Sequence, residues 1–84
     1  MTKDELRAAI VEEIGNIAPE ADLAGVPDGA DLREAIDLDS MDIFNLVVAL
    51  SKRLAIDIPD ADAIRLVTLG GGTEYLAERL APRS

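Results

Sequence analysis

Residues 39–54, DSMDIFNLVVALSKRL, carry the strongest helical pattern in the chain. At about 100° per residue, most of their apolar side chains return to one face, as in an amphipathic helix. We therefore predict a helix over residues 40–54 whose apolar face packs against the core of a small domain. That face consists of Ile43, Leu46, Val47, Leu50 and Leu54.

Three further apolar side chains, Met41, Phe44 and Val48, fall on nearly the opposite face of the same helix. A second apolar stripe on a short helix needs a partner of its own. Two interpretations are open. A loop of the same chain folds back over the stripe, or the stripe is an exposed docking patch for another protein.

The N-terminal half predicts one helix followed by a long loop. Thr2 and Glu5 have the spacing of a capping box, and aliphatic residues at helical spacing follow them. Stop signals place the end of this helix near residues 14–17. Residues 18–39 are rich in Pro, Gly and Asp, which predicts a loop that its scattered aliphatic side chains pin to the core.

The C-terminal part predicts a short helix and a longer one. Pro59 is expected to end any structure before it, and a short helical turn follows over residues 59–66, which Asp60 is expected to cap. Thr68 is expected to cap the last helix. The run Gly70–Gly72 at its start is unfavourable, since each glycine costs about 1 kcal/mol against alanine. The helix begins late, or it frays, or a neighbour approaches its backbone closely.

Together these elements predict an all-α fold. The expected architecture is a small four-helix bundle with three main helices, one short helix and a long loop between the first and second helices. With 84 residues, we expect residues 1–84 to form a single domain. Hydrophobic residues make up 49% and aromatic residues 2%, so the core must be aliphatic.

The net charge of −9 argues against binding to nucleic acid or to an anionic membrane surface, because both require a basic face. It favours basic protein partners. Residues 1–42 hold 12 of the 17 acids and 3 of the 8 bases, so the negative charge lies in the N-terminal half. The chain has no cysteine and no apolar run of membrane-spanning length, and we expect no signal peptide, because residues 1–10 are charged and lack the apolar core of one. We expect a cytoplasmic monomer.

Ser40 lies among carboxylates at the predicted start of the strongest helix. A nucleophilic serine needs a base, and the chain has no histidine and no cysteine, so we do not expect an enzyme. A calcium loop beginning at Asp37 would need glycine sixth and glutamate twelfth, where Asp42 and Val48 stand, so we expect no metal site. Two interpretations remain: Ser40 or Asp39 is a helix cap, or Ser40 is a modification site.

The ordered motifs from Leu32 to Leu80 resemble those of the acyl carrier protein family. The resemblance rests on Asp39-Ser40-Met41 before an aliphatic helix, then Ile58-Pro59-Asp60 before a short helix, then Thr68-Leu69. It implies that Ser40 accepts a 4′-phosphopantetheine arm from coenzyme A. A separate phosphopantetheinyl transferase would attach the arm, whose thiol would then hold an acyl or aminoacyl group as a thioester.

The resemblance also implies a set of partners and a surface for them. An acyl- or aminoacyl-activating ligase would load the arm, and downstream acyl-processing enzymes would use the cargo. Asp39 would help to place Ser40 for the transferase. Partner recognition would fall to the second helix, at Met41, Asp42, Phe44, Asn45, Val48 and Lys52. The rival interpretation is a small acidic helical interaction module in which Ser40 is only a cap.

Some residues depart from the family pattern. Asp37 stands where glycine is common, and Asn45, Ser51, Lys52 and Arg53 stand where carriers of fatty acid synthesis are typically acidic. Bases on this face should weaken docking to enzymes built for an acidic one. We therefore expect a specialised pathway, served by an aminoacyl carrier, a secondary-metabolism carrier or a specialised lipid carrier. Gly70–Gly72 and Thr73 further suggest a smaller or looser interior.

Overall fold

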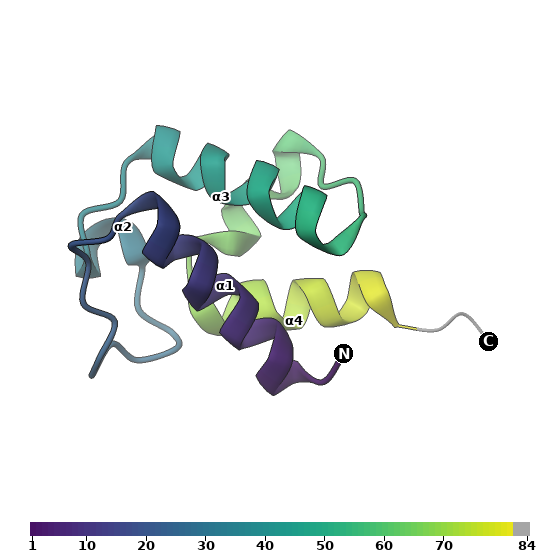
Figure 1. The fold of residues 1–84 in the computed structure, drawn as a ribbon, viewed down its shortest axis with the longest axis horizontal. Coiled ribbons are helices and arrows are strands. Elements are labelled where there is room, and N and C mark those ends of the chain that lie inside the picture. Colours follow the sequence, from purple (N-terminus) through teal and green to yellow (C-terminus); the bar gives the residue numbers. More distant parts are fainter. Residues whose placement is uncertain (82–84) are drawn as a thin grey trace.

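The computed structural model describes residues 1–81, and these fold into a helical bundle without strands (Figure 1). The predicted all-α fold is confirmed. The elements in chain order are α1 (Lys3–Ile17), α2 (Leu32–Ala35), α3 (Ser40–Leu54), η1 (Asp60–Leu66) and α4 (Leu69–Leu80). In the described part of the chain, no helix is both long and apolar enough to cross a membrane.

Helix α1 begins with the predicted capping box. The Glu5 amide donates to the Thr2 hydroxyl at 3.1 Å, and the Thr2 amide donates to the Glu5 carboxylate at 2.8 Å. These bonds satisfy amides that the first helical turn leaves without partners. The helix ends at Ile17, within the predicted range.

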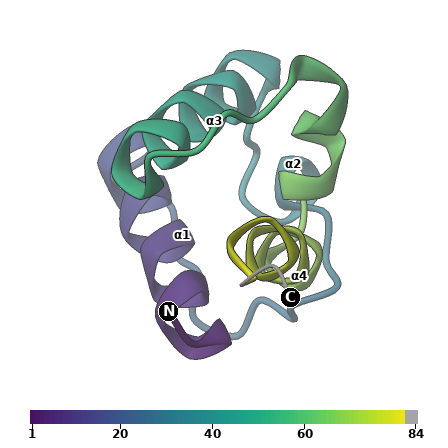
Figure 2. The same cartoon turned by 90° about the vertical axis from the view of Figure 1, so that its right-hand side faces the viewer.

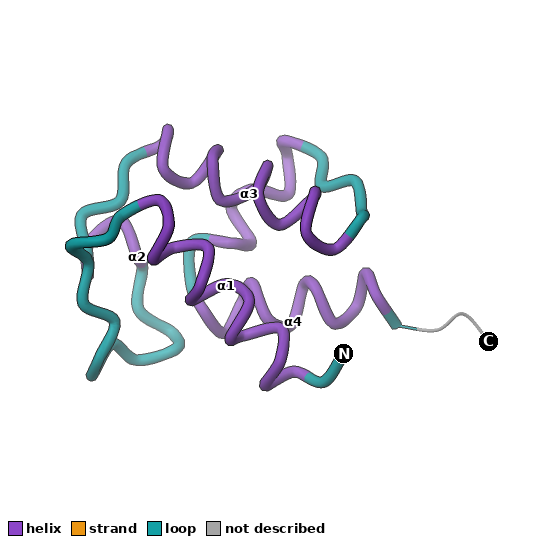
Figure 3. The backbone as a smooth tube through the Cα atoms, in the orientation of Figure 1, coloured by secondary structure: helices purple, strands orange, loops and turns teal. Residues whose placement is uncertain are grey.

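The segment between α1 and α3 is not wholly a loop, which corrects the prediction for residues 18–39 (Figure 3). Asp31 caps the four-residue helix α2 by accepting from the Arg33 amide at 2.9 Å. Leu32, the first residue of α2, is fully buried, and its amide donates to the Val67 carbonyl at 2.8 Å. A helix of one turn is too short to show apolar periodicity, so no signal for it was present in the sequence.

The short helix η1 is a 3-10 helix, and its predicted cap is wrong. Pro59, not Asp60, occupies the cap position, and no side chain caps the helix. The Pro59 carbonyl instead accepts from the Asp62 amide at 2.9 Å. Because that carbonyl starts the helix, Asp60 becomes its first residue and its carboxylate is left at the surface.

The core is aliphatic apart from the buried Tyr75, close to what the composition predicted, and lies where α1, α3 and α4 meet. Figure 2 views α4 nearly end-on, with α1 to one side and η1 to the other. The predicted inner face of α3 is buried at four of its five positions, and Leu54 is half-buried. The largest fully buried side chains are Leu6, Ile10, Ile14, Leu32, Leu46, Leu50, Leu66, Leu69 and Leu76.

The glycine run in α4 serves close packing. A Cβ on Gly72 would lie 3.0 Å from Leu66 Cδ2 and 3.2 Å from Ile10 Cδ1. The Gly70 amide donates to the Asp28 carbonyl at 2.9 Å, which ties the long loop to α4. The helix begins at Leu69, directly after its Thr68 cap, so it does not start late. The expectation of a looser interior is wrong here, because a neighbour fills the space that a side chain would take.

Candidate functional site

Asp39, not Ser40, caps helix α3. The Asp42 amide donates to the Asp39 carboxylate at 2.8 Å, and the Asp39 amide donates to the Asp42 carboxylate at 3.2 Å. Ser40 is therefore the first helical residue, and its side chain is exposed. The interpretation of Ser40 as the cap is wrong. The Ser40 hydroxyl lies at the positive end of α3 and is not used to cap it.

The backbone just before this helix is in an unusual conformation. Asp37 has φ 57°, in the left-handed region that glycine adopts without cost. Asp37 stands where the acyl carrier protein family, which the sequence resembles, often has glycine, and aspartate is among the few other residues that tolerate this conformation. The departure therefore keeps the backbone turn and adds a carboxylate near Ser40.

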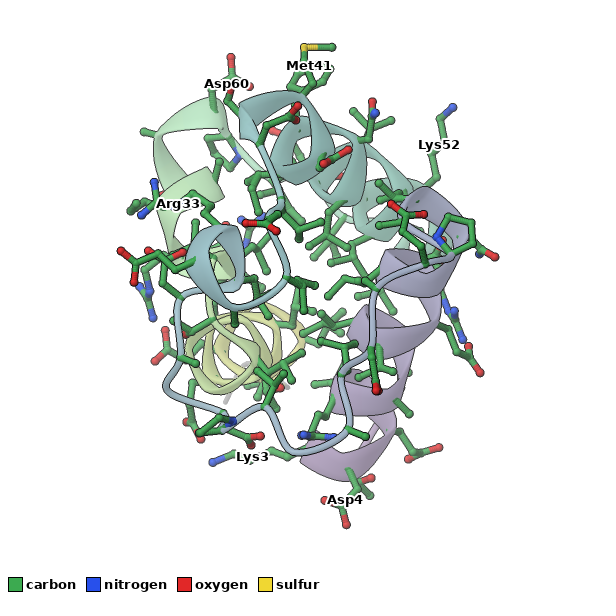
Figure 4. The ribbon with its side chains drawn as sticks, turned by 90° about the vertical axis from the view of Figure 1, so that its left-hand side faces the viewer. Lys3, Asp4, Arg33, Met41, Lys52 and Asp60 are labelled. Carbon is green, nitrogen blue, oxygen red and sulfur yellow. The ribbon has the colours of Figure 1, made fainter. Side chains whose placement is uncertain are left out.

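A groove of about 310 Å³ opens beside Ser40 between α3 and η1. Its walls are mostly aliphatic, and two charged side chains, Arg33 from α2 and Asp60 from η1, also line it. In Figure 4 Asp60 and Met41, the neighbour of Ser40, lie at the top of the view, and Arg33 lies below Asp60 at the left. The apolar lining residues are Ile43, Phe44, Val47, Ala63, Ile64 and Val67.

The second apolar stripe of α3 is exposed to solvent. Met41 is 62% exposed and Phe44 is 50% exposed, while Val48 is half-buried. Ile64 of η1, which shares the groove with Phe44, is 58% exposed. The long loop therefore does not cover this stripe, and of the two interpretations only the exposed patch agrees with the structure.

Comparison with known proteins identifies this arrangement. The profile of a family described as "Phosphopantetheine attachment site" matches residues 4–76. The chain belongs to the acyl carrier protein family. It is 31% identical over 77 residues to an acyl carrier protein of Chlamydia muridarum (strain MoPn / Nigg), covering 92% of this chain and 94% of that protein. It is 32% identical over 73 residues to one of Wolinella succinogenes, covering 87% and 90%.

Family membership implies a covalently attached 4′-phosphopantetheine and a carrier without catalytic activity of its own. It also implies contact with a phosphopantetheinyl transferase and with acyl-processing enzymes. The described residues contain no cluster of acidic side chains that could hold a metal ion. What the carrier offers instead is an exposed hydroxyl, an apolar groove beside it and an exposed apolar stripe.

The two bases near the end of α3 have different surroundings. Arg53 donates to Glu13 of α1 at 3.0 Å and lies 2.6 Å from a carboxylate oxygen of Glu12. Hydrogen bonds to these two carboxylates raise the pKa of Arg53. Arg53 thus joins α3 to α1, and its charge is compensated within the carrier. Lys52 is exposed, as is Asn45 earlier on the same helix.

Of the residues that line the groove, only Ser40 and Phe44 were among the candidates drawn from the sequence, and Arg33 and Ile64 are two of those that it missed. Arg33 is the one base between residues 8 and 51, a signal that the sequence contained. Its place in the groove that Ser40 also lines depends on α2, which the sequence did not predict. Ile64 carried no signal, because in so short a helix an aliphatic residue is equally compatible with burial and exposure.

Proposed function

We propose that this protein carries its cargo on a 4′-phosphopantetheine arm attached to Ser40. One observation supports the site most strongly: the Ser40 hydroxyl is exposed at the first turn of α3 and is not needed for the cap. A transferase can approach such a hydroxyl without unfolding the helix. The adjacent groove, with its aliphatic walls, fits the apolar parts of an arm or its cargo.

Attachment transfers the phosphopantetheine group from coenzyme A to the Ser40 hydroxyl. The Ser40 Oγ forms a phosphoester bond as the pyrophosphate link of coenzyme A breaks, and adenosine 3′,5′-bisphosphate leaves. The hydroxyl proton passes to a base of the transferase, because this chain has no histidine to accept it. When bound, the arm supplies the thiol on which an acyl or aminoacyl group is held as a thioester, and the chain itself has no cysteine.

The recognition surface in this proposal is the outer face of α3. Asp39 and Asp42 cap the helix at the turn that presents Ser40. Their carboxylates would also attract basic residues of a transferase. Met41 and Phe44 supply the exposed apolar contacts. Asn45, Val48 and Lys52 continue this face toward the end of the helix. An acyl- or aminoacyl-activating ligase and later acyl-processing enzymes, in the cytoplasm, would use the same face.

We also propose a specialised pathway, such as secondary metabolism, in place of general fatty acid synthesis. Support comes from Lys52, whose exposed charge stands on a face that general carriers keep acidic. Arg53 adds little positive charge to this face, since Glu12 and Glu13 compensate its charge. The pathway proposal therefore rests on Lys52 and on the neutral neighbours Asn45 and Ser51.

A thiol assay tests the carrier function. Because the chain has no cysteine, a thiol-specific reagent should find no thiol before treatment with a transferase and coenzyme A. After treatment it should find one thiol per chain, and an activating ligase should then block that thiol by loading its acyl or aminoacyl group. A chain that gains no thiol would contradict the proposal.

A charge reversal tests the pathway. Lys52→Glu should raise the rate at which general fatty acid synthase enzymes elongate chains on the loaded carrier, because it restores the acidic face. Lys3→Glu, at the distant end of the molecule, makes the same change in net charge and should leave that rate unaltered (Figure 4). Ordinary elongation rates on the wild-type carrier would refute the specialised pathway and leave the carrier function standing.

A further inference from the structure

We propose that Arg33 holds the phosphate of the arm on Ser40, so that the first part of the arm lies in the groove between α3 and η1. This inference rests on the proposed attachment at Ser40. It assigns to α2, which nothing in the sequence pattern pointed to, the role of orienting the arm.

The groove is lined by residues from different helices. Arg33 comes from α2 and Ser40 from the first turn of α3, and both line the same space. In Figure 4 Arg33 lies beside the ribbon of η1, on the side of the view away from Lys52. The phosphate of an arm attached at Ser40 would start at the mouth of this groove.

The guanidinium of Arg33 is held in place before any ligand arrives. Its Nε donates to Asp31 Oδ1 at 3.0 Å, and its Nη2 donates to Asp31 Oδ2 at 2.7 Å. Asp31 is itself fixed because it caps α2 through the Arg33 amide. A guanidinium has five N–H donors, so three remain for a phosphate after these two bonds. A positioned fork of this kind suits phosphate better than a flexible lysine.

The surroundings of Ser40 are already negatively charged. A phosphodiester adds a negative charge next to Asp37, Asp39 and Asp42, and Asp60 lies across the groove. The positive end of α3 favours an anion there, but only over the first turn. Among the residues that the structure describes, Arg33 is the one cationic side chain that lines the groove. Its charge is already paired with that of Asp31, so its contribution to the phosphate would be the N–H donors that this pair leaves free.

The apolar wall of the groove extends the argument beyond the phosphate. The part of the arm next to its phosphate carries two geminal methyl groups, which gain from contact with aliphatic side chains. Val47, Ala63 and Ile64 provide such contact in the groove. An arm fixed at its phosphate by Arg33 would place these methyl groups against that wall.

Nuclear magnetic resonance of the loaded carrier tests the inference. In the wild type, attachment should shift the Arg33 Nη–H resonances, and the methyl groups of the arm should show NOEs to the methyls of Val47 and Ala63. Arg33→Gln should lose these NOEs and shift the phosphorus resonance, and Arg33→Lys should retain part of them. High salt should weaken them in the wild type, since the contact is partly exposed.

Arg7→Gln is the matched control. Arg7 makes the same kind of pair with Asp28, at 2.8 to 3.3 Å, far along the chain and outside the groove. Its loaded form should keep every arm NOE. Unmoved Arg33 Nη–H resonances in the wild type, or NOEs that persist in Arg33→Gln, would overturn the inference while attachment at Ser40 stands. Failure to attach any arm would instead overturn the proposed function, and this inference with it.

Discussion

At the scale of single residues, the start of α3 gives helix capping and the exposed hydroxyl to different residues, which the sequence alone could not distinguish. Asp39 and Asp42 satisfy the free amides of the first turn, and Ser40 is left exposed beside them. The sequence predicted that a cap existed here but not which residue it was, because serine and aspartate are equally good caps. The structure assigns the cap position to Asp39 through its extended backbone, with φ −95°, and its hydrogen bonds with Asp42.

Substitutions of Asp39 separate its capping role from recognition. Asp39→Ala should lower the free energy of unfolding by about 1 kcal/mol, because it removes the cap bond to the Asp42 amide. Asp39→Asn can still accept that bond and should keep most of the stability. If a transferase also reads the carboxylate, Asp39→Asn should slow attachment of the arm all the same. Urea unfolding and attachment rates measure the two effects, and equal attachment rates in the Asp39→Asn variant and the wild type would confine Asp39 to capping.

Ala55 gives a second prediction at this scale. It ends α3 in the left-handed conformation, with φ 55°, where a side chain is unfavourable. Ala55→Gly should raise the free energy of unfolding by up to about 1 kcal/mol. Ala8→Gly, at an exposed position inside α1, is the control and should lower it by about 1 kcal/mol. A loss of stability in Ala55→Gly would show that this strain is absent.

At the scale of elements, the sequence predicted the helices with clear periodicity and missed the short ones. The bounds of α1 and α3 followed from capping residues and apolar spacing. Helix α2 and the 3-10 character of η1 did not, because such short helices are held by tertiary bonds. For α2 the Leu32 amide bonds to Val67, a residue far away in the sequence. The glycines of α4 were visible, but the neighbours that require them were not.

Glycine substitutions test this account of α4. Gly72→Ala should lower the free energy of unfolding by about 1–3 kcal/mol, because the added carbon would press on Leu66 and Ile10. Gly15→Ala in α1 has no atom within 4 Å of the new carbon and should be neutral or stabilising, by up to about 1 kcal/mol. Chemical unfolding of both variants gives the comparison. If Gly72→Ala were as stable as Gly15→Ala, close approach would not explain the glycine run.

At the scale of the whole molecule, polar bonds hold η1 against α4 on the far side of the groove. The buried Tyr75 hydroxyl donates to Asp62 at 2.6 Å and accepts from Arg79 at 2.7 Å, and Arg65 and Arg79 lie over its ring. Burial, followed by the hydrogen bond to Asp62, raises the pKa of Tyr75 above its ordinary value. The position of η1, and with it one wall of the groove, depends on this network.

Tyr75 makes the stability of the fold sensitive to alkali. Because its pKa is higher in the folded chain than in the unfolded one, its contribution is complete below the unfolded value of about 10. The contribution is lost as the pH rises through the folded pKa. The difference in unfolding free energy between wild type and Tyr75→Phe should therefore be constant from pH 7 to about pH 9 and shrink above about pH 10. A difference that stays constant into strong alkali would show that the hydroxyl does not stabilise the fold.

Intact-mass spectrometry is the most direct test of whether Ser40 receives the arm. The protein is first incubated with a promiscuous transferase and coenzyme A. The wild type should gain the mass of one phosphopantetheine, and peptide mapping should place it on Ser40. Ser51→Ala is the matched control and should be modified like the wild type, since the half-buried Ser51 hydroxyl already donates to the Val47 carbonyl. Ser40→Ala should gain nothing. An unmodified wild type, or an adduct that persists in Ser40→Ala, would contradict the account.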